Sequence, residues 1–242
     1  MTGTPIYAVG DIHGQLEMLE SALRVIEADG GPDARIVFLG DLVDRGDSSR
    51  QVIDRLMNGQ AEGRNWTVLC GNHDDLFASF LRTGAVDDVR IKSGIPWTGA
   101  RLGGLTTLAS YGMTDLDRPA EALWADAKTA VPATHLTYLE GLPDHVLIDD
   151  LLFVHAGIRP GIALTDQTRD DLMWIRQEFL DHPRQHPWLV VHGHTAVQSA
   201  EHKGNRVNLD SGAGYGRPIT AAVFQNGRVW TLDAMGRMPL EP

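Results

Sequence analysis

The chain has 242 residues, 43% of them hydrophobic, and a formal net charge of −11. This length and apolar content support one sizeable core, so we expect a single domain over residues 1–242. The acidic balance argues against binding to nucleic acid or to an anionic membrane surface. The lone cysteine, Cys70, excludes an internal disulfide. We find no leader and no apolar run of about 18 residues, so we predict a cytoplasmic protein.

The first 70 residues alternate between apolar runs and helical patterns. Three apolar runs predict buried strands at Ile6–Val9, Ile36–Leu39 and Val68–Cys70. Helices are predicted between them at Gln15–Glu27 and Ser48–Met57, where apolar residues recur at spacings of three and four. Such alternation is typical of βαβ units, and it predicts a parallel sheet in this half of the chain.

The rest of the chain has a different pattern. The stretch 83–116 is rich in glycine and poorly periodic, and we interpret it as a cap or loop in which Trp97 and Tyr111 pack rather than contact substrate. Helices are predicted at 120–128 and 133–140 and strands at 151–154, 188–191, 206–209, 219–225 and 228–232, with a hairpin turn at Asn226-Gly227. We therefore expect an α/β fold of two face-to-face mixed β-sheets flanked by helices.

Three segments about 30 residues apart share one arrangement. They read VGDIHG at 9–14, LGDLVDRG at 39–46 and CGNHD at 70–74. In each, a predicted strand ends in glycine, and a residue with a metal-binding side chain follows. Ligands of open α/β sheets bind at this edge, where the strands end. The pattern therefore predicts a metal centre.

Two later strands extend the pattern, because His155 follows one of them and the sequence HGHT at 192–195 follows the other. Imidazole and carboxylate ligands together suit Zn, Fe, Mn and related ions. There are too many candidate ligands for one ion, whereas two ions sharing a bridging carboxylate would use them well.

These motifs resemble those of the PPP family of metallophosphoesterases, the calcineurin-like enzymes that include bacterial and phage serine/threonine protein phosphatases. The matches are GDIHG at 10–14, GDLVDRG at 40–46, GNH at 71–73, HAG at 155–157 and GHT at 193–195. They occur in the family's order and span most of the chain. The resemblance implies the fold predicted above and a dinuclear-metal phosphomonoesterase, most closely a serine/threonine protein phosphatase.

The resemblance also assigns roles to individual residues. It implies that Asp11 and His13 bind one metal, that Asp41 bridges both, and that Asn72, His155 and His194 bind the second. His73 would be the acid that protonates the leaving oxygen, with Asp44 as its carboxylate partner. Arg45, Arg176 and Asn72 would bind the phosphoryl group. The cofactors implied are two divalent transition-metal ions, Mn first and Fe or Zn as alternatives, and the substrate would be a phosphoprotein or a phosphorylated small molecule.

The chemistry agrees with these roles. Two divalent ions polarise a phosphoryl group and lower the pKa of a bridging water, so that a hydroxide attacks in line. A histidine oriented by an aspartate can protonate the leaving alkoxide. Arginine offers bidentate hydrogen bonds to phosphate.

Other readings remain open. The family more often has glutamate at the position of Asp74, and Asp74 and Ala156 resemble a sister group, the symmetrical diadenosine tetraphosphate hydrolases. A metallophosphoesterase-like scaffold that binds a partner without catalysis is a third possibility. His192 is expected to pack rather than to bind metal. We assign no metal role to the histidines at 135, 145, 182, 186 and 202.

Overall fold

The computed structural model describes residues 3–242, in which the strands form two mixed sheets. The order in the first sheet is β11 (Gly236–Pro239), β10 (Arg228–Asp233), β9 (Ala221–Gln225), β1 (Ile6–Val9), β2 (Arg35–Phe38), β3 (Trp66–Val68). The order in the second is β4 (His145–Ile148), β5 (Leu151–Val154), β6 (Leu189–His192), β8 (Arg206–Asn208), β7 (Glu201–His202). Parallel strands occupy β1-β2-β3 and β5-β6-β8, and the remaining neighbours pair antiparallel.

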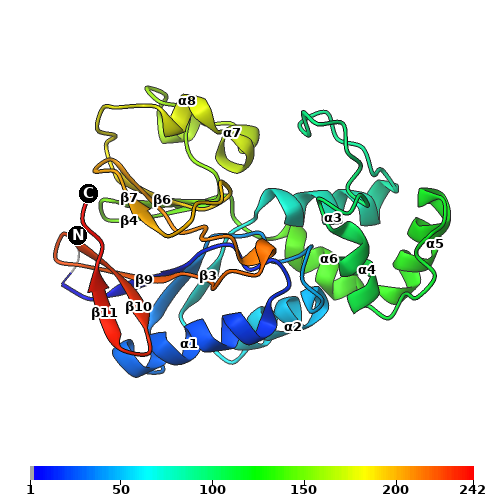
Figure 1. Cartoon of the computed structure of the whole chain (residues 1–242), viewed down its shortest axis with the longest axis horizontal. Coiled ribbons are helices and arrows are strands. Elements are labelled where there is room, and N and C mark those ends of the chain that lie inside the picture. The colour runs from blue at the N-terminus through cyan, green and yellow to red at the C-terminus, as the bar shows by residue number, and fades with distance from the viewer. Residues whose placement is uncertain (1–2) are drawn as a thin grey trace.

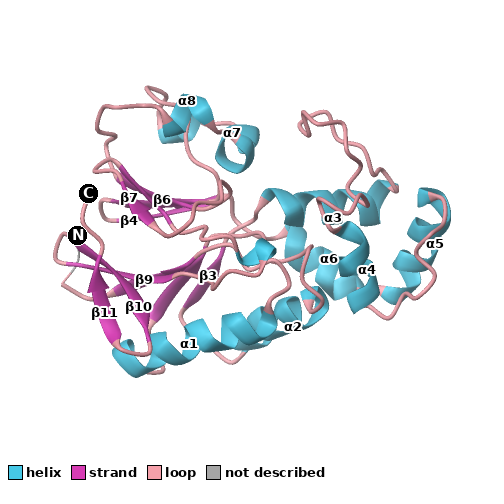
Figure 2. Cartoon of the chain, in the orientation of Figure 1, coloured by secondary structure: helices cyan, strands magenta, loops and turns pink. Residues whose placement is uncertain are grey.

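The two sheets lie face to face between helices (Figures 1 and 2). The helices are α1 (Leu16–Gly30), α2 (Ser49–Ala61), α3 (Asn72–Thr83), α4 (Gly104–Ser110), α5 (Ala120–Ala130), α6 (Ala133–Glu140), α7 (Arg169–Trp174) and α8 (Gln177–Leu180). Short 3₁₀ turns lie at Leu164–Asp166 and Ala213–Tyr215. In Figure 1, α7 and α8 cover the second sheet, α1 and α2 run beneath the first, and α3 to α6 gather at one end.

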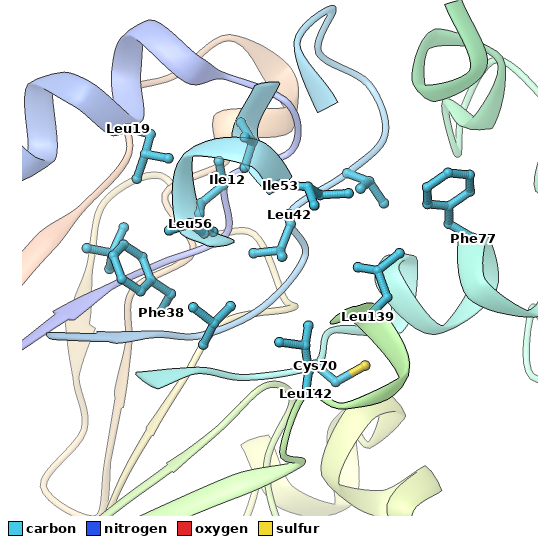
Figure 3. Close-up of a cluster of buried hydrophobic side chains, with 14 of the residues drawn as sticks. Ile12, Leu19, Phe38, Leu42, Ile53, Leu56, Cys70, Phe77, Leu139 and Leu142 are labelled. Atoms are coloured by element: carbon cyan, nitrogen blue, oxygen red, sulfur yellow. The ribbon is translucent and has the colours of Figure 1, made fainter. Parts of the chain in front are cut away.

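Successive side chains of a strand point to opposite faces of the sheet, so the core is divided into two layers. In β1, Ile6 and Ala8 belong to the apolar cluster between the sheets, together with Phe153 of the second sheet. Their neighbours Tyr7 and Val9 belong to the cluster against the helices. Figure 3 shows that second cluster, where Leu19 of α1, Leu56 of α2 and Phe77 of α3 are among the buried side chains. Because apolar side chains pack on both faces of the central strands, this packing fixes the positions of their carboxyl ends.

The predicted fold class is confirmed, and most predicted elements fall within a few residues of the observed ones. The hairpin at Asn226-Gly227 forms, with both residues at positive φ, 50° and 79°. Strands β4, β7 and β11 were not predicted from the sequence. They lie at sheet edges and include exposed or half-buried positions; β7 and β11 have no apolar run, and that of β4 is only three residues long. Among residues 3–242, no helix is both long and apolar enough to cross a membrane.

Candidate metal centre

The candidate site is built from turns that follow strands of both sheets, and these turns are bonded to one another. The amide of His13 donates to the Asp41 carbonyl at 2.8 Å, and the amide of Gly193 donates to the His155 carbonyl at 2.8 Å. The His194 amide donates to the Asp11 carboxylate at 3.1 Å, which ties the two sheets together. His13, Asp41 and His194 have positive φ, of 47°, 52° and 65°. These non-glycine residues hold a disfavoured backbone conformation because the surrounding turns fix it.

The turns after β2 and β3 meet backbone to backbone. A Cβ on Gly71 would collide with the amide nitrogen and the carboxylate of Asp41. A Cβ on Gly40 would lie 2.5 Å from the Gly71 nitrogen. Only glycine therefore allows Asp41 and the next turn to approach this closely.

Two groups of buried side chains at these turns can each hold a metal ion. One comprises His13, Asp41 and His73, and the other comprises Asp41, His155 and His194, with the ligand atoms of each group within 4.8 Å of one another. Asp41 belongs to both. Its Oδ2 lies 3.5 Å from His13 Nε2, and its Oδ1 lies 3.4 Å from His155 Nε2. The two oxygens thus face different groups, as a bridging carboxylate requires.

Backbone carbonyls orient two of the imidazoles. His13 Nδ1 lies 2.9 Å from the Val43 carbonyl oxygen, and His155 Nδ1 lies 2.8 Å from that of Leu39. A carbonyl oxygen only accepts, so each Nδ1 carries the proton and each Nε2 carries the lone pair, which is the tautomer that can bind a metal. Asn72 Oδ1 lies 2.9 Å from His155 Nε2 and 2.7 Å from His194 Nδ1, which places the amide oxygen at the second group.

Burial sets the protonation of the imidazoles. It lowers the pKa of His13, His155 and His194, so these rings are neutral at neutral pH, the form that binds metal. Burial raises the pKa of Asp11, and the nearby carboxylates of Asp210 and Asp41 raise it further.

The donor set fits divalent transition-metal ions. Three carboxylates, those of Asp11, Asp41 and Asp210, crowd one buried point, and a cation there would relieve their repulsion. His194 Nδ1 and the Asn72 amide oxygen face each other at 2.7 Å beside these carboxylates. Such mixed imidazole, amide and carboxylate donors suit Mn, Fe or Zn.

Asp210 is a residue of this centre that the sequence analysis did not identify. It lies just beyond β8 and is 5% exposed, and its Oδ1 accepts a hydrogen bond from the Gly212 amide at 2.9 Å. The signal was present, because Asp210 follows a strand that runs parallel to β6, as the predicted ligands follow theirs.

The predicted acid and its partner are in contact. His73 Nδ1 lies 2.6 Å from Asp44 Oδ2, and Asp44 is fully buried. Trp97 Nε1 donates to the same oxygen at 2.8 Å, and Thr107 Oγ1 donates to the other oxygen at 2.6 Å. Trp97 therefore packs in the core, as expected, and also holds the carboxylate that orients His73. The contribution of Thr107 was not foreseen.

Asp74 has a structural role in this arrangement. It is buried, and its carboxylate accepts from the Leu42 amide at 2.9 Å and from the Gly71 amide at 2.8 Å. It thus caps the start of α3 and fastens the third turn to the second. Asp74 belongs to neither metal-binding group.

The predicted phosphate-binding arginines lie at the mouth of the centre. Arg45 Nη1 donates to His13 Nε2 at 2.5 Å, and its Nη2 donates to His73 Nε2 at 3.1 Å. Arg176 Nη1 donates to Thr195 Oγ1 at 3.0 Å. Both arginines and Asn72 line the same cavity. His192 is buried against the Phe179 ring, with centroids 5.1 Å apart, and belongs to neither metal-binding group, nor do the other histidines left without a metal role.

The cavity in front of the centre has a volume of about 1020 Å³. Within residues 3–242 its basic lining residues are Arg45, Arg90, Lys92, Arg101, Arg159, Arg176 and Arg217. Trp174 and Tyr215 supply aromatic rings, and Arg45 lies over the ring of Tyr215 at 5.0 Å. Five acidic residues of the described chain also line the cavity, so basic side chains are in local excess here although the chain has net charge −11, as binding of an anionic ligand requires.

The fold, the paired metal-binding groups and the histidine–aspartate pair define a metallophosphoesterase. The sequence profile of the calcineurin-like phosphoesterase family matches residues 4–224, and the chain belongs to that family.

Named relatives and solved structures resemble this chain over nearly its whole length. The asymmetrical bis(5'-nucleosyl)-tetraphosphatase PrpE of Anoxybacillus flavithermus is 27% identical, over 96% of this chain and 94% of the relative. A crystal structure provisionally assigned as a diadenosine tetraphosphatase has a TM-score of 0.66 and 23% identity, covering 97% of this chain and 96% of that one. A cold-active protein-tyrosine phosphatase of a Shewanella species has a TM-score of 0.65 and 16% identity, covering 98% and 80%.

Proposed function

We propose that this phosphoesterase hydrolyses dinucleoside polyphosphates of the diadenosine tetraphosphate class. The observation that carries the proposal is the cationic cavity beside the metal centre, lined by seven basic side chains among the described residues and by Trp174 and Tyr215. A phosphomonoester needs few cations beyond those at the reacting phosphate, whereas a chain of four phosphates needs many. The aromatic rings offer surfaces on which a nucleobase can stack.

Each group of residues at the site would have a separate role in phosphate hydrolysis. Arg45 and Arg176 bind the non-bridging phosphoryl oxygens and hold the phosphorus in place for in-line attack. When bound, two divalent ions held around Asp41 by the ligands that the family resemblance assigns, which leave His73 free of metal, would polarise the phosphoryl group and provide a hydroxide nucleophile near neutral pH. His73, held by Asp44, is placed to give a proton to the leaving oxygen.

The named relatives support this substrate class, since PrpE is described as an asymmetrical bis(5'-nucleosyl)-tetraphosphatase. Asymmetrical cleavage of diadenosine tetraphosphate gives AMP and ATP, whereas symmetrical cleavage gives two ADP. We propose the asymmetrical products.

A protein serine/threonine phosphatase is the second candidate, and one contact favours it. The His73–Asp44 pair, at 2.6 Å, would protonate a poor leaving group such as the alkoxide of a serine or threonine side chain. A nucleoside triphosphate is a much better leaving group and has less need of an acid. The pair would therefore matter most in hydrolysis of a phosphoserine or phosphothreonine ester.

A substrate panel on the metal-loaded protein tests the proposal. Diadenosine tetraphosphate and phosphoserine, phosphothreonine and phosphotyrosine peptides are compared by kcat/KM, and the nucleotide products are separated by chromatography. We expect the highest kcat/KM on diadenosine tetraphosphate, with AMP and ATP as products. A higher kcat/KM on a phosphopeptide would favour the protein phosphatase, and ADP as the main product would favour symmetrical cleavage. A folded protein that takes up metal and turns over no substrate would support a binding scaffold.

A further inference from the structure

Two cations of the cavity lack the partners that the others have. Five of its basic residues bind other groups: Arg45 the histidines, Arg90 and Arg159 carboxylates, Arg176 a hydroxyl and Arg217 backbone carbonyls. Lys92 and Arg101 also line the cavity but make no hydrogen bond or ion pair within residues 3–242. Both are exposed, so each keeps its charge available to a ligand at little cost in desolvation.

The turn that carries Lys92 is fixed by its neighbour. The Gly94 amide donates to the Ile91 carbonyl at 2.9 Å and closes the turn. Arg90 donates to Asp75 of α3 at 2.8 Å and to Asp170 of α7 at 3.1 Å. The guanidinium of Arg90 also lies 4.9 Å from the ring centroid of Trp174. Lys92 is therefore presented from a turn anchored to both sides of the cavity.

The turn that carries Arg101 packs against the turn that carries Arg45. The Gly103 amide donates to the Gly99 carbonyl at 2.9 Å. Gly103, at a φ of +89°, packs so closely on Arg45 that a Cβ would lie 2.8 Å from the Arg45 Cα. The Cα of Arg101 thus lies within about 7 Å of that contact, two residues along the chain. Arg101 is held next to the residue that would bind the attacked phosphate.

We infer that Lys92 and Arg101 form a distal anion subsite that binds the phosphates of a linear polyphosphate beyond the one attacked. The inference rests on the proposed function, because a monoester would not reach past Arg45. The acidic residues lining the cavity near α7, Asp170, Asp171 and Glu178, are already paired with Arg90 or Arg159. These carboxylates therefore do not neutralise the charges of Lys92 and Arg101. The distal subsite would make binding depend on the length of the phosphate chain.

Inhibition by inorganic phosphates tests the subsite separately from turnover of any nucleotide. Hydrolysis of p-nitrophenyl phosphate is measured with orthophosphate or inorganic tripolyphosphate as competitor, at constant free metal ion. We expect wild-type protein to bind tripolyphosphate about tenfold more tightly than orthophosphate. Lys92→Gln and Arg101→Gln should each weaken tripolyphosphate binding by about fivefold and change orthophosphate binding less than about twofold, because each removes one charge-assisted hydrogen bond.

Arg35→Gln is the matched control, because Arg35 is an exposed cation at the start of β2 that does not line the cavity. It removes the same charge and should leave both inhibition constants unchanged. Equal tripolyphosphate inhibition in the double variant and in Arg35→Gln would overturn the subsite. So would a double variant that weakens only the binding of acidic phosphopeptides.

The subsite and the proposed function can fail separately. Tight tripolyphosphate inhibition that depends on Lys92 and Arg101, in a protein that does not cleave diadenosine tetraphosphate, would uphold the subsite and reject the function. Cleavage of diadenosine tetraphosphate with unchanged kinetics in the double variant would do the reverse. Since both side chains are exposed, the glutamine variants should fold, which circular dichroism and thermal unfolding would check.

Discussion

The wall of the cavity that carries the metal-binding groups is buried and bonded turn to turn, whereas the wall formed by segment 84–103 presents exposed cations. On the first wall Asp41, His73 and His155 are each at most 3% exposed, and backbone hydrogen bonds join successive turns. On the second, Lys92 and Arg101 have no partner within the described residues. The buried wall can hold metal ligands in fixed positions, and we propose that segment 84–103 influences which anionic substrates bind.

Asp41→Asn tests the wall that carries the metal-binding groups, and it should have the largest effect of the substitutions considered. Asp41 is shared by both metal-binding groups, and the substitution removes its charge while keeping its size. We expect both sites to lose metal, and the rate to fall about 10⁴-fold, since the metals supply several kcal/mol to the transition state and each 1.36 kcal/mol is tenfold. Elemental analysis gives the metal content. Two metals per folded Asp41→Asn chain would contradict the bridging role.

His73→Asn tests the acid. The rate on alkyl phosphate esters should fall by about 10²–10⁴-fold, the usual contribution of general acid catalysis. The loss should be smaller for p-nitrophenyl phosphate and for diadenosine tetraphosphate, whose leaving groups need less protonation. Steady-state kinetics on the three substrates measures the difference. Equal losses on all three would remove His73 from the acid role.

His194 and His192 form a matched pair within one turn. His194→Ala should weaken one metal site and lower the rate by about 10²-fold or more, because His194 lies in the second metal-binding group. His192→Phe should keep both metals and much of the rate, since His192 packs against Phe179. Metal content and activity are measured on both proteins. A folded His192→Phe chain with a single metal would show that the assignment is reversed.

Trp97→Phe tests the connection between the two walls, because Trp97 belongs to segment 84–103 and donates to Asp44. The variant loses one hydrogen bond to a carboxylate and keeps an aromatic ring against Phe77 and Phe80. We expect kcat on alkyl esters to fall about tenfold, consistent with about 1.5 kcal/mol for such a bond. The dependence of kcat on pH should also change, because Trp97 contacts the carboxylate that orients the proposed acid. A fall confined to thermal stability, with an unchanged profile, would limit Trp97 to packing.

The sequence predicted the sheet edge far better than the opposite wall, and the reason is local. Each predicted ligand on the first wall follows its own strand within a few residues, so a strand pattern and a polar residue were enough. Trp97 and Thr107 act on Asp44 across 53 and 63 positions of sequence, and nothing near either residue records that contact. A role for Lys92 and Arg101 likewise cannot be predicted from the sequence, because it depends on their position in the lining of the cavity. Asp210 is different, because its strand was predicted and the same rule would have found it.

The close approach of Gly40 and Gly71 has a consequence for engineering this enzyme. Because the two turns touch through main-chain atoms, no side chain between them can be enlarged or trimmed to adjust the position of Asp41. A side chain at either glycine would place a Cβ within 2.5 Å of main-chain atoms, so substitution there should destabilise the site. A library confined to exposed positions of segment 84–103 leaves the turns intact, so new substrate preferences should be sought there.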